Sequence, residues 1–240
     1  ETIRSGRYYD VEFEPVSASP SGVLEIALST PVTGLEIHYT TDCSTPTPQS
    51  PRYDRPVRLE RSAIVKAIAC RQGAVVSDVR EKEFIVHRAT GKAITLTAPP
   101  SPKYPPKDGP AALVNGVTGS GSYADGQWVG MEGADLEAVI DLGAATEVTT
   151  VSVGSLSSRS SWVHRTPLVE LFGSADGQTF AKLGEGADPG GDDPILRLKV
   201  SFPAATTRYL KVLVHNQVIP EGADGAGQPA WLFVDEIIVQ

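Results

Sequence analysis

The sequence predicts an all-β protein built from two β-sandwich domains. Nearly every apolar run either alternates apolar and polar residues or is short and continuous, as strands do. The runs are separated by turn-forming residues, and the chain has 23 glycines and 19 prolines. No window of the 240 residues sustains the i, i+3, i+4, i+7 apolar spacing of an amphipathic helix.

The expected strands fall into two groups along the chain. The first group comprises residues 23–28, 35–40, 63–70 and 80–87. The second comprises residues 136–142, 147–156, 168–174, 196–203, 208–216 and 231–239. A proline-rich stretch separates the groups, so we predict a first sandwich over 1–92, a linker over 93–110 and a second sandwich over 111–240.

Composition excludes several classes of partner. The net charge is −8 and the isoelectric point is near 5.0, whereas nucleic acids and anionic membranes both require a basic face. No run of apolar residues is long enough to cross a bilayer, so no membrane span is expected. The chain starts in strand-like alternation without a signal peptide, and we expect it to be part of a longer protein.

A glycine-rich run at residues 119–124, "GSGSYA", matches the G-x-G-x-x-G/A pattern of a dinucleotide-binding loop. Asp141 follows at about the distance expected of a ribose-binding acid. That fingerprint requires a strand before it and a helix after it, and no helical pattern follows here. We therefore interpret the run as a loop whose glycines let backbone carbonyls turn inward. Such carbonyls, with Asn and Ser oxygens, are ligands for hard cations.

The chain contains two cysteines, Cys43 and Cys70. Two cysteines cannot supply a four-ligand zinc site. They are either two free thiols or one disulfide formed in an oxidising compartment. A disulfide would require the two Cα atoms to lie within about 7 Å, which adjacent strands of one small sheet could provide.

The first group of strands contains a recognisable motif. The run "IHYTTDCSTPTPQSPRYDRPVRL", followed by "AIVKAIAC" and "GAVVSDV", resembles the small Ig/Fn3-like sandwich that follows the catalytic barrel in bacterial chitobiases and β-hexosaminidases. The resemblance covers about residues 10–90. This chain has Cys43 where that family's Tyr-Thr-Thr-Asp-Gly-Ser-Thr-Pro pattern has glycine, which raises a question about the turn.

The second group resembles a discoidin-type (coagulation factor 5/8 C-type) jelly-roll sandwich, and within that superfamily a family 32 carbohydrate-binding module. The matching runs are "ALVNGVTGSGSYADGQWVGMEGADLEAVIDLG", "VELFGSADGQTFAKL", "TRYLKVLV" and "WLFVDEIIV". The tandem of both domains resembles the C-terminal end of family 20 glycoside hydrolases, the exo-acting β-N-acetylhexosaminidases. The resemblance implies glycans as partners, a catalytic domain upstream in the same chain, and a periplasmic, cell-surface or extracellular location.

Catalytic residues are not expected in this part of the protein. Family 20 enzymes use an adjacent Asp-Glu pair, and the chain offers Asp235-Glu236. The pair lies in an expected strand, where neighbouring side chains point to opposite faces, so the two carboxylates should not converge on one sugar. The chain also lacks the strand–helix alternation of a (β/α)₈ barrel and any G-x-S-x-G motif.

The resemblance also implies a structural calcium site in the glycine-rich loop. The matching side chains are Asn115, Ser120 and Glu236, with backbone carbonyls of Leu113 and Thr118. Asn115 replaces the usual aspartate, which lowers the ligand charge and with it the expected affinity. The alternative is a polar loop without metal.

Sugar sites in such modules lie on the loops at one end of the sandwich, where an aromatic ring covers the pyranose and polar groups hold its hydroxyls. The matching candidates are Arg159, Trp162, His164, Arg165 and Asn216. Trp162 could instead be a tryptophan at the rim of the core, and His164 and Arg165 could be solvated loop residues.

These observations lead to one main hypothesis and two alternatives. The main hypothesis is a non-catalytic accessory region of a β-N-acetylhexosaminidase-like glycoside hydrolase, which binds terminal galactose, GalNAc or GlcNAc. The first alternative is a structural module that braces the catalytic domain or mediates self-association and binds no sugar. Binding to a protein or lipid surface ranks last, because the run at 218–225 is mostly polar or small.

Overall fold

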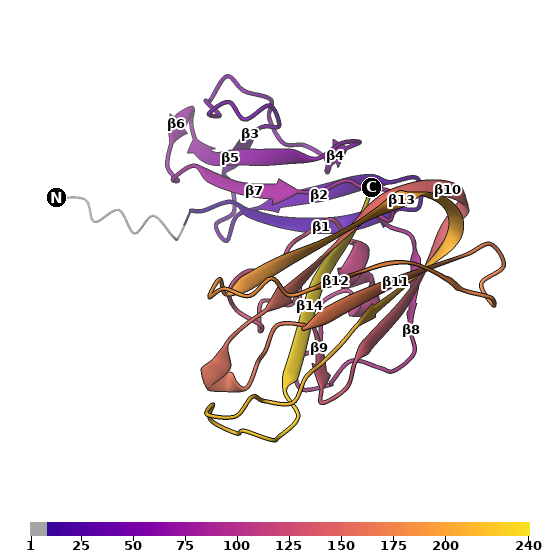
Figure 1. The fold of residues 1–240 in the computed structure, drawn as a ribbon. Helices are drawn as coiled ribbons and strands as arrows, with labels where there is room; N and C mark the ends of the chain where they lie inside the picture. The colour runs from indigo at the N-terminus through magenta and orange to yellow at the C-terminus, as the bar shows by residue number, and fades with distance from the viewer. Residues whose placement is uncertain (1–8) are drawn as a thin grey trace. The chain divides into compact units, whose positions relative to one another are not determined.

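A computed structural model describes residues 9–240 of the chain (Figure 1). The elements are almost all strands, and the prediction of an all-β protein with sandwich sheets is confirmed. The described residues divide into two compact units. The first comprises residues 9–19 and Val23–Val86, and the second Pro20–Gly22 and His87–Gln240. Within residues 9–240, no helix is long and apolar enough to span a membrane.

The first unit consists of two small sheets. One sheet has the order β1 (Glu12–Ser19), β2 (Val23–Ser29), β4 (Val57–Leu59). The other has the order β3 (Glu36–Thr40), β5 (Ala63–Arg71), β6 (Ala74–Val75), with β7 (Arg80–Phe84) on the other edge of β5. Leu24 and Ile26 of β2 are fully buried, as are Val65 and Ala67 of β5, so the alternation in these strands identifies their core face.

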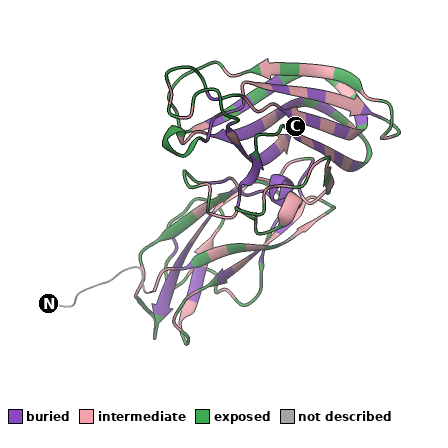
Figure 2. Cartoon of the chain, turned by 90° about the horizontal axis from the view of Figure 1, so that it is seen from below, coloured by how far each residue is buried: buried purple, intermediate pink, exposed green. Residues whose placement is uncertain are grey.

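The second unit contains a larger set of strands and two short 3₁₀ helices, η2 and η3. In chain order they are β8 (Ala93–Leu96), η2 (Gly109–Val114), β9 (Val129–Glu132), β10 (Leu136–Leu156), η3 (Arg159–Ser161), β11 (Leu168–Ser174), β12 (Ala181–Ala187), β13 (Ile195–Val214) and β14 (Trp231–Val239). Buried residues alternate with exposed or half-buried ones along much of β13 and the first half of β10, whereas β14 is buried along almost its whole length (Figure 2).

Two long antiparallel strands, β10 and β13, take part in both layers of this unit. The first half of β10 pairs with β8 and with the second half of β13, which also pairs with β11. The second half of β10 pairs with the first half of β13 and with β14, which also pairs with β9. Register shifts near residues 141–150 of β10 interrupt the pairing where the strand passes from one layer to the other. The apolar side chains facing inward from both layers form one core.

The segment 93–110, which the prolines of the sequence suggest is a linker, belongs to the second unit. Residues Ala93–Leu96 form β8, which pairs with β10. Ile94 and Leu96 pack against the core, and η2 begins at Gly109. A short apolar alternation next to prolines therefore forms an edge strand, because that edge of β10 offers it backbone partners.

The two cysteines lie within the described residues, and both are free. Cys70 is buried and is paired with Glu36 at the start of β3, whereas Cys43 is exposed and follows the end of β3. The length of β3 therefore separates them, at roughly 3.3 Å per residue over Glu36–Thr40, which is well beyond disulfide reach. The proposed bridge fails because antiparallel pairing places Thr40, at the end of β3, opposite Lys66 in the middle of β5, whereas Cys70 lies near the end of β5.

Cys43 adopts a left-handed backbone conformation with φ 67°, which is the conformation that glycine adopts at low cost. The chain thus keeps the turn geometry expected of glycine at this position. Asp42 helps to hold the turn by accepting hydrogen bonds from the backbone N–H and the hydroxyl of Ser44.

We predict that thiol titration distinguishes the two cysteines. The native protein should expose one reactive thiol per chain, Cys43, because Cys70 is fully buried and burial raises the pKa of its thiol. The denatured, unreduced protein should show two. The measurement is a chromogenic thiol assay with and without denaturant, and Cys43→Ser serves as the control that removes the native signal. Detection of no free thiol in the denatured, unreduced protein would contradict the structure and support a Cys43–Cys70 disulfide.

Candidate functional site

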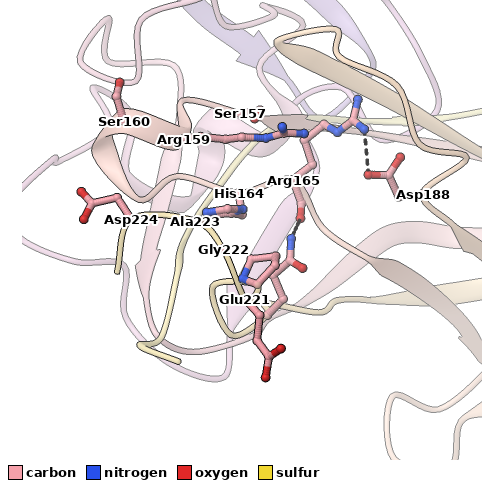
Figure 3. Close-up of a pocket in the computed structure, with 12 residues that line it drawn as sticks. Ser157, Arg159, Ser160, His164, Arg165, Asp188, Glu221, Gly222, Ala223 and Asp224 are labelled. Atoms are coloured by element: carbon pink, nitrogen blue, oxygen red, sulfur yellow. Dashed lines mark hydrogen bonds and ion pairs between the residues drawn. The ribbon is translucent and has the colours of Figure 1, made fainter. Parts of the chain in front are cut away.

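An open pocket with a volume of about 630 Å³ lies in the loops of the second unit (Figure 3). Its lining comes from the loop after β10, the loop after β12 and the long loop before β14. The lining residues are Ser157, Arg159, Ser160, His164, Arg165, Asp188, Gln217, Pro220, Glu221, Gly222, Ala223 and Asp224. This size lies within the range of small-molecule sites, and the lining mixes both signs of charge with neutral polar groups.

The loop after β10 is folded back on itself by its own backbone. The N–H of Ser158 donates to the carbonyl of Val163, and the short helix η3 lies between these residues. The N–H of His164 then donates to the carbonyl of Trp231 at the start of β14. Because the backbone is fixed at both ends, the directions of the side chains on this loop are determined by the fold.

Trp162 closes η3 in a left-handed conformation, with φ 60°. Its ring lies against Gly225, where a Cβ atom would collide with it, and its Nε1 donates to Asp224 over 3.4 Å. The side chain is 38% exposed, so it does not lie in the core; it is not among the residues that line the pocket, but its partner Asp224 is. A bulky residue held at positive φ is costly, and such strain is concentrated at functional sites.

His164 lines the pocket and is only 6% exposed. Figure 3 shows its ring in the middle of the lining residues. Its Nε2 atom is buried and has no hydrogen-bond partner among the described residues. Burial lowers the pKa of His164, and the positive charge of Arg159 lowers it further, so the imidazole is neutral at pH 7. A buried polar atom without a partner costs about 1–3 kcal/mol, which a ligand or a water molecule could offset.

The two arginines of the predicted sugar site have different surroundings. Arg165 is buried, and its guanidinium pairs with Asp188 and donates to the carbonyls of Gly191 and Asp193. These contacts engage both terminal nitrogens of the guanidinium, so Arg165 braces the loop after β12. Arg159 is exposed, and a terminal nitrogen of its guanidinium lies 3.8 Å from a carboxylate oxygen of Asp192. Only Arg159 has a side chain that can turn toward a ligand.

Asn216 does not line the pocket. Its amide donates to the carbonyls of Ala134 and Ala230, and its side-chain oxygen accepts from the N–H of Gln217. It therefore fixes the base of the last loop. Gln217, one residue later, lines the pocket and donates to the carbonyl of Arg165. The loop that contains it could be identified from the sequence, but which of its residues faces inward could not.

The pocket also contains three acidic residues that sequence reasoning missed, Asp188, Glu221 and Asp224. Glu221 and Asp224 lie in the last loop, which was expected to contribute. Asp188 lies after β12, in a turn that gave no signal beyond its run of glycine and aspartate.

The Asp235-Glu236 pair lies at a break in the register of β14. Val153 pairs with Ile237 and Ser155 with Val234, so Gly154 of β10 faces both acidic residues. Such a bulge interrupts the alternation of side chains that the sequence reasoning assumed. Both carboxylates are fully buried. A Cβ atom on Gly154 would overlap Asp235 and Arg197, so glycine is required there.

The two buried carboxylates bind different partners, and each also holds the glycine-rich loop. Asp235 pairs with Arg197 through both oxygens and accepts from the N–H of Gly119. Glu236 accepts from His87 over 2.6 Å and from the N–H of Gly116 over 2.9 Å. Burial raises the pKa of both carboxyl groups, against the lowering effect of their donors.

The residues of the predicted calcium site do not form a ready cation cage. The side-chain oxygen of Asn115 accepts from the N–H of Val117, and its amide donates to Asp108 and Gln127. Ser120 is exposed, and its hydroxyl accepts from the N–H of Ser122. Among the predicted side-chain ligands, only Glu236 Oε2 is buried without a partner in the described chain. With the carbonyls of Leu113 and Thr118 the predicted site has five donors, fewer than the six to eight oxygen ligands that calcium takes, and the side-chain oxygens of Asn115 and Ser120 already accept protein hydrogen bonds. Calcium stays a prediction.

The glycine-rich run lies in the loop between η2 and β9, as expected. Gly119 lies against the indole ring of Trp128, which is buried and donates from Nε1 to the carbonyl of Ser120. The run therefore wraps a core tryptophan. Its glycines allow the backbone to approach the ring closely.

Comparison with known proteins gave the following similarities. Residues 26–84 match the family model Fn3 associated. A comparison with curated proteins found no match. Similar solved structures include the CBM32 module, a carbohydrate-binding module, of AlyQ in complex with 4,5-unsaturated mannuronic acid, with TM-score 0.42 and 18% identity over 62% of this chain and 93% of that one.

Two further similar structures are also described as binding sugars. CpGH89CBM32-5 from Clostridium perfringens, in complex with GalNAc-β-1,3-galactose, has TM-score 0.40 and 16% identity over 61% of this chain and 93% of that one. The Streptococcus pneumoniae fucose-binding module SpX-3 has TM-score 0.41 and 11% identity over 65% of this chain and 98% of that one.

We predict that two glycines of one loop differ sharply in their tolerance of a methyl group. Gly119→Ala should destabilise the protein by about 2 kcal/mol, because the added Cβ would overlap the ring of Trp128. Gly121→Ala is the matched control, because no other described atom lies within 4 Å of its added Cβ, and it should change stability by less than about 0.5 kcal/mol. Chemical denaturation monitored by tryptophan fluorescence measures both. Equal effects would contradict the packing described.

We also predict that removal of calcium leaves the stability of the second unit unchanged. Glu236 is already held by His87 and by the N–H of Gly116, and the other predicted side chains have protein partners. The melting temperature should be the same in excess EDTA and in millimolar calcium. A calcium-dependent rise would show that the metal binds the folded state and that the loop rearranges to receive it.

Proposed function

We propose that the second unit binds the terminal sugar of a glycan in the pocket around His164. The observation that carries this proposal is an open, polar pocket lined by His164, whose Nε2 atom is buried and has no hydrogen-bond partner among the described residues, so that a small shift of the side chains around it would let a ligand reach it. A fold retains an unsatisfied polar atom at a cost, and a ligand hydroxyl that exchanges a hydrogen bond with it would remove that cost.

The other groups around the pocket suit a pyranose. Sugar hydroxyls both donate and accept, and Ser157, Ser160 and Gln217 supply neutral side chains that can do the same. The partly exposed ring of Trp162, which contacts the lining residue Asp224, offers an apolar surface for the C–H face of the sugar. The side chain of Arg159 is exposed and can reach over the mouth of the pocket.

The parent protein is proposed on different grounds. The resemblance of both units to the C-terminal end of family 20 glycoside hydrolases supports a non-catalytic accessory region of a β-N-acetylhexosaminidase-like enzyme. Galactose, GalNAc and GlcNAc are then the first sugars to test, and the enzyme would act in the periplasm, at the cell surface or outside the cell. The sequence upstream of Glu1 tests this directly, because a hydrolase barrel should precede it.

We predict that His164→Phe separates binding from folding. The substitution keeps an aromatic ring but removes the unpartnered nitrogen, so stability should rise by about 1 kcal/mol while sugar affinity falls at least about tenfold. Isothermal titration of the 240-residue chain with galactose, GalNAc and GlcNAc measures the affinity, and chemical denaturation measures the stability. Trp162→Ala should weaken binding as well, whereas Trp162→Phe should retain most of it.

The control for these variants is Tyr209→Ala, which removes an aromatic ring that lines neither the pocket nor its rim. The affinity of Tyr209→Ala for these sugars should equal that of the wild type. If the wild-type chain binds none of these sugars and no glycan on an array, the result would favour the structural alternative. In that alternative this region braces the catalytic domain or mediates self-association and binds no sugar.

A further inference from the structure

A second hollow, with a volume of about 320 Å³, opens in the second unit next to the pocket already described. It is lined mainly by aromatic and small residues. Tyr104, Tyr123 and the buried Trp128 contribute rings, and Ala124 lies at its exposed side. We call this hollow the aromatic cleft.

The two tyrosine rings of the aromatic cleft pack against each other and against aromatic rings of β14. Tyr123 is stacked on Phe233 with ring centroids 5.3 Å apart, and Tyr104 meets Tyr123 edge-on at 5.2 Å. Tyr104 also packs edge-on against Trp231 and Phe233. Both tyrosines are half-buried, so each retains accessible ring surface. Fixed aromatic rings bind an apolar ligand surface with little loss of side-chain entropy.

The short helix η3 links the aromatic cleft to the His164 pocket. The hydroxyl of Tyr123 donates to Ser161 over 3.4 Å, and Ser160, the preceding residue of η3, lines the His164 pocket. The carbonyl of Trp162, the residue that closes η3, accepts from the N–H of Trp231, whose ring packs against Tyr104. One turn of chain therefore lines the His164 pocket and contacts a tyrosine of the aromatic cleft.

The charge at the mouth of the aromatic cleft indicates what kind of ligand fits. The ammonium group of Lys103 is paired with Glu132 over 2.7 Å and lies 5.3 Å from the ring centre of Trp231. Its charge is thus already balanced by a carboxylate. An anionic ligand would gain little there, whereas a neutral ring with one apolar face could cover the tyrosines.

We propose that the aromatic cleft is a second sugar subsite, so that the ligand of this unit is a neutral oligosaccharide that spans η3 instead of a single terminal sugar. This inference rests on the proposed function, since the His164 pocket holds the first sugar. The ring of Tyr104 or Tyr123 stacks on a following pyranose, and η3 lies beneath the glycosidic link. Affinity then increases with chain length, because each added contact comes from the same bound molecule.

Calorimetric titration of the 240-residue chain tests this with matched short and long ligands. The probes are GlcNAc against chitotetraose, and galactose against β-1,4-galactotetraose. For the wild type, the tetrasaccharide of the recognised sugar should bind at least about fivefold more tightly than the monosaccharide. Ala124→Arg, which fills the cleft without removing a packed ring, should abolish that gain and leave monosaccharide affinity unchanged. Tyr104→Ala should do the same, and Tyr209→Ala, outside both hollows, should change neither affinity.

The outcomes separate this inference from the function on which it rests. Equal affinity for the monosaccharide and the tetrasaccharide, or a wild-type gain in Ala124→Arg, overturns the second subsite and leaves the His164 pocket in place. Loss of monosaccharide binding in Ala124→Arg also overturns it, because the two hollows would then be one site. Absence of binding by the wild type to every probe overturns the second subsite, and absence of binding also to GalNAc and across a glycan array overturns the proposed function as well.

Discussion

Two buried carboxylates on β14, Asp235 and Glu236, attach the glycine-rich loop to the rest of the second unit. The positions of the loops around the candidate site depend on this attachment. Burying an ionised group costs several kcal/mol unless other groups compensate for the lost water. Here Arg197 and the N–H of Gly119 compensate Asp235, and His87 and the N–H of Gly116 compensate Glu236. The glycine-rich loop is thereby attached to the final strand at two points. The contacts with His87, Gly116 and Gly119 join parts of the chain more than a hundred residues apart, so they can form only when the sandwich is complete.

The attachment of that loop extends, contact by contact, to the candidate site. Gly119 packs on Trp128, and Trp128 shares a buried cluster with Val163 and Phe233. Val163 directly precedes His164, whose N–H is fixed by the carbonyl of Trp231. The position of His164 is therefore set by packing as well as by its own loop. This arrangement gives a preorganised histidine on a loop, which a flexible connection could not provide.

Charged residues in and around the pocket have distinct roles. Arg165 and Asp188 pair with each other and stiffen the wall, while Arg159, Glu221 and Asp224 lie nearer the solvent. The neutral imidazole of His164 lies between these groups, kept uncharged by its burial. A pocket built this way presents hydrogen-bonding groups without a dominant charge, which suits neutral hydroxyl-rich ligands better than strongly charged ones.

The sequence by itself determined the fold class, the two groups of strands and two of the three loops that line the pocket, because alternation and turn residues are local signals. It also identified Trp162 and His164 as candidates, since the resemblance marks the loop that contains them. Only the tertiary structure decided which polar groups are free. The side chains of Arg165 and Asn216 already make hydrogen bonds to backbone carbonyls. Cys43 and Cys70 lie apart because β3 and β5 pair in antiparallel directions. The hydrogen-bond partners of a side chain come from segments that are distant in the sequence. A local sequence pattern does not show which of those segments lie next to it in the folded protein.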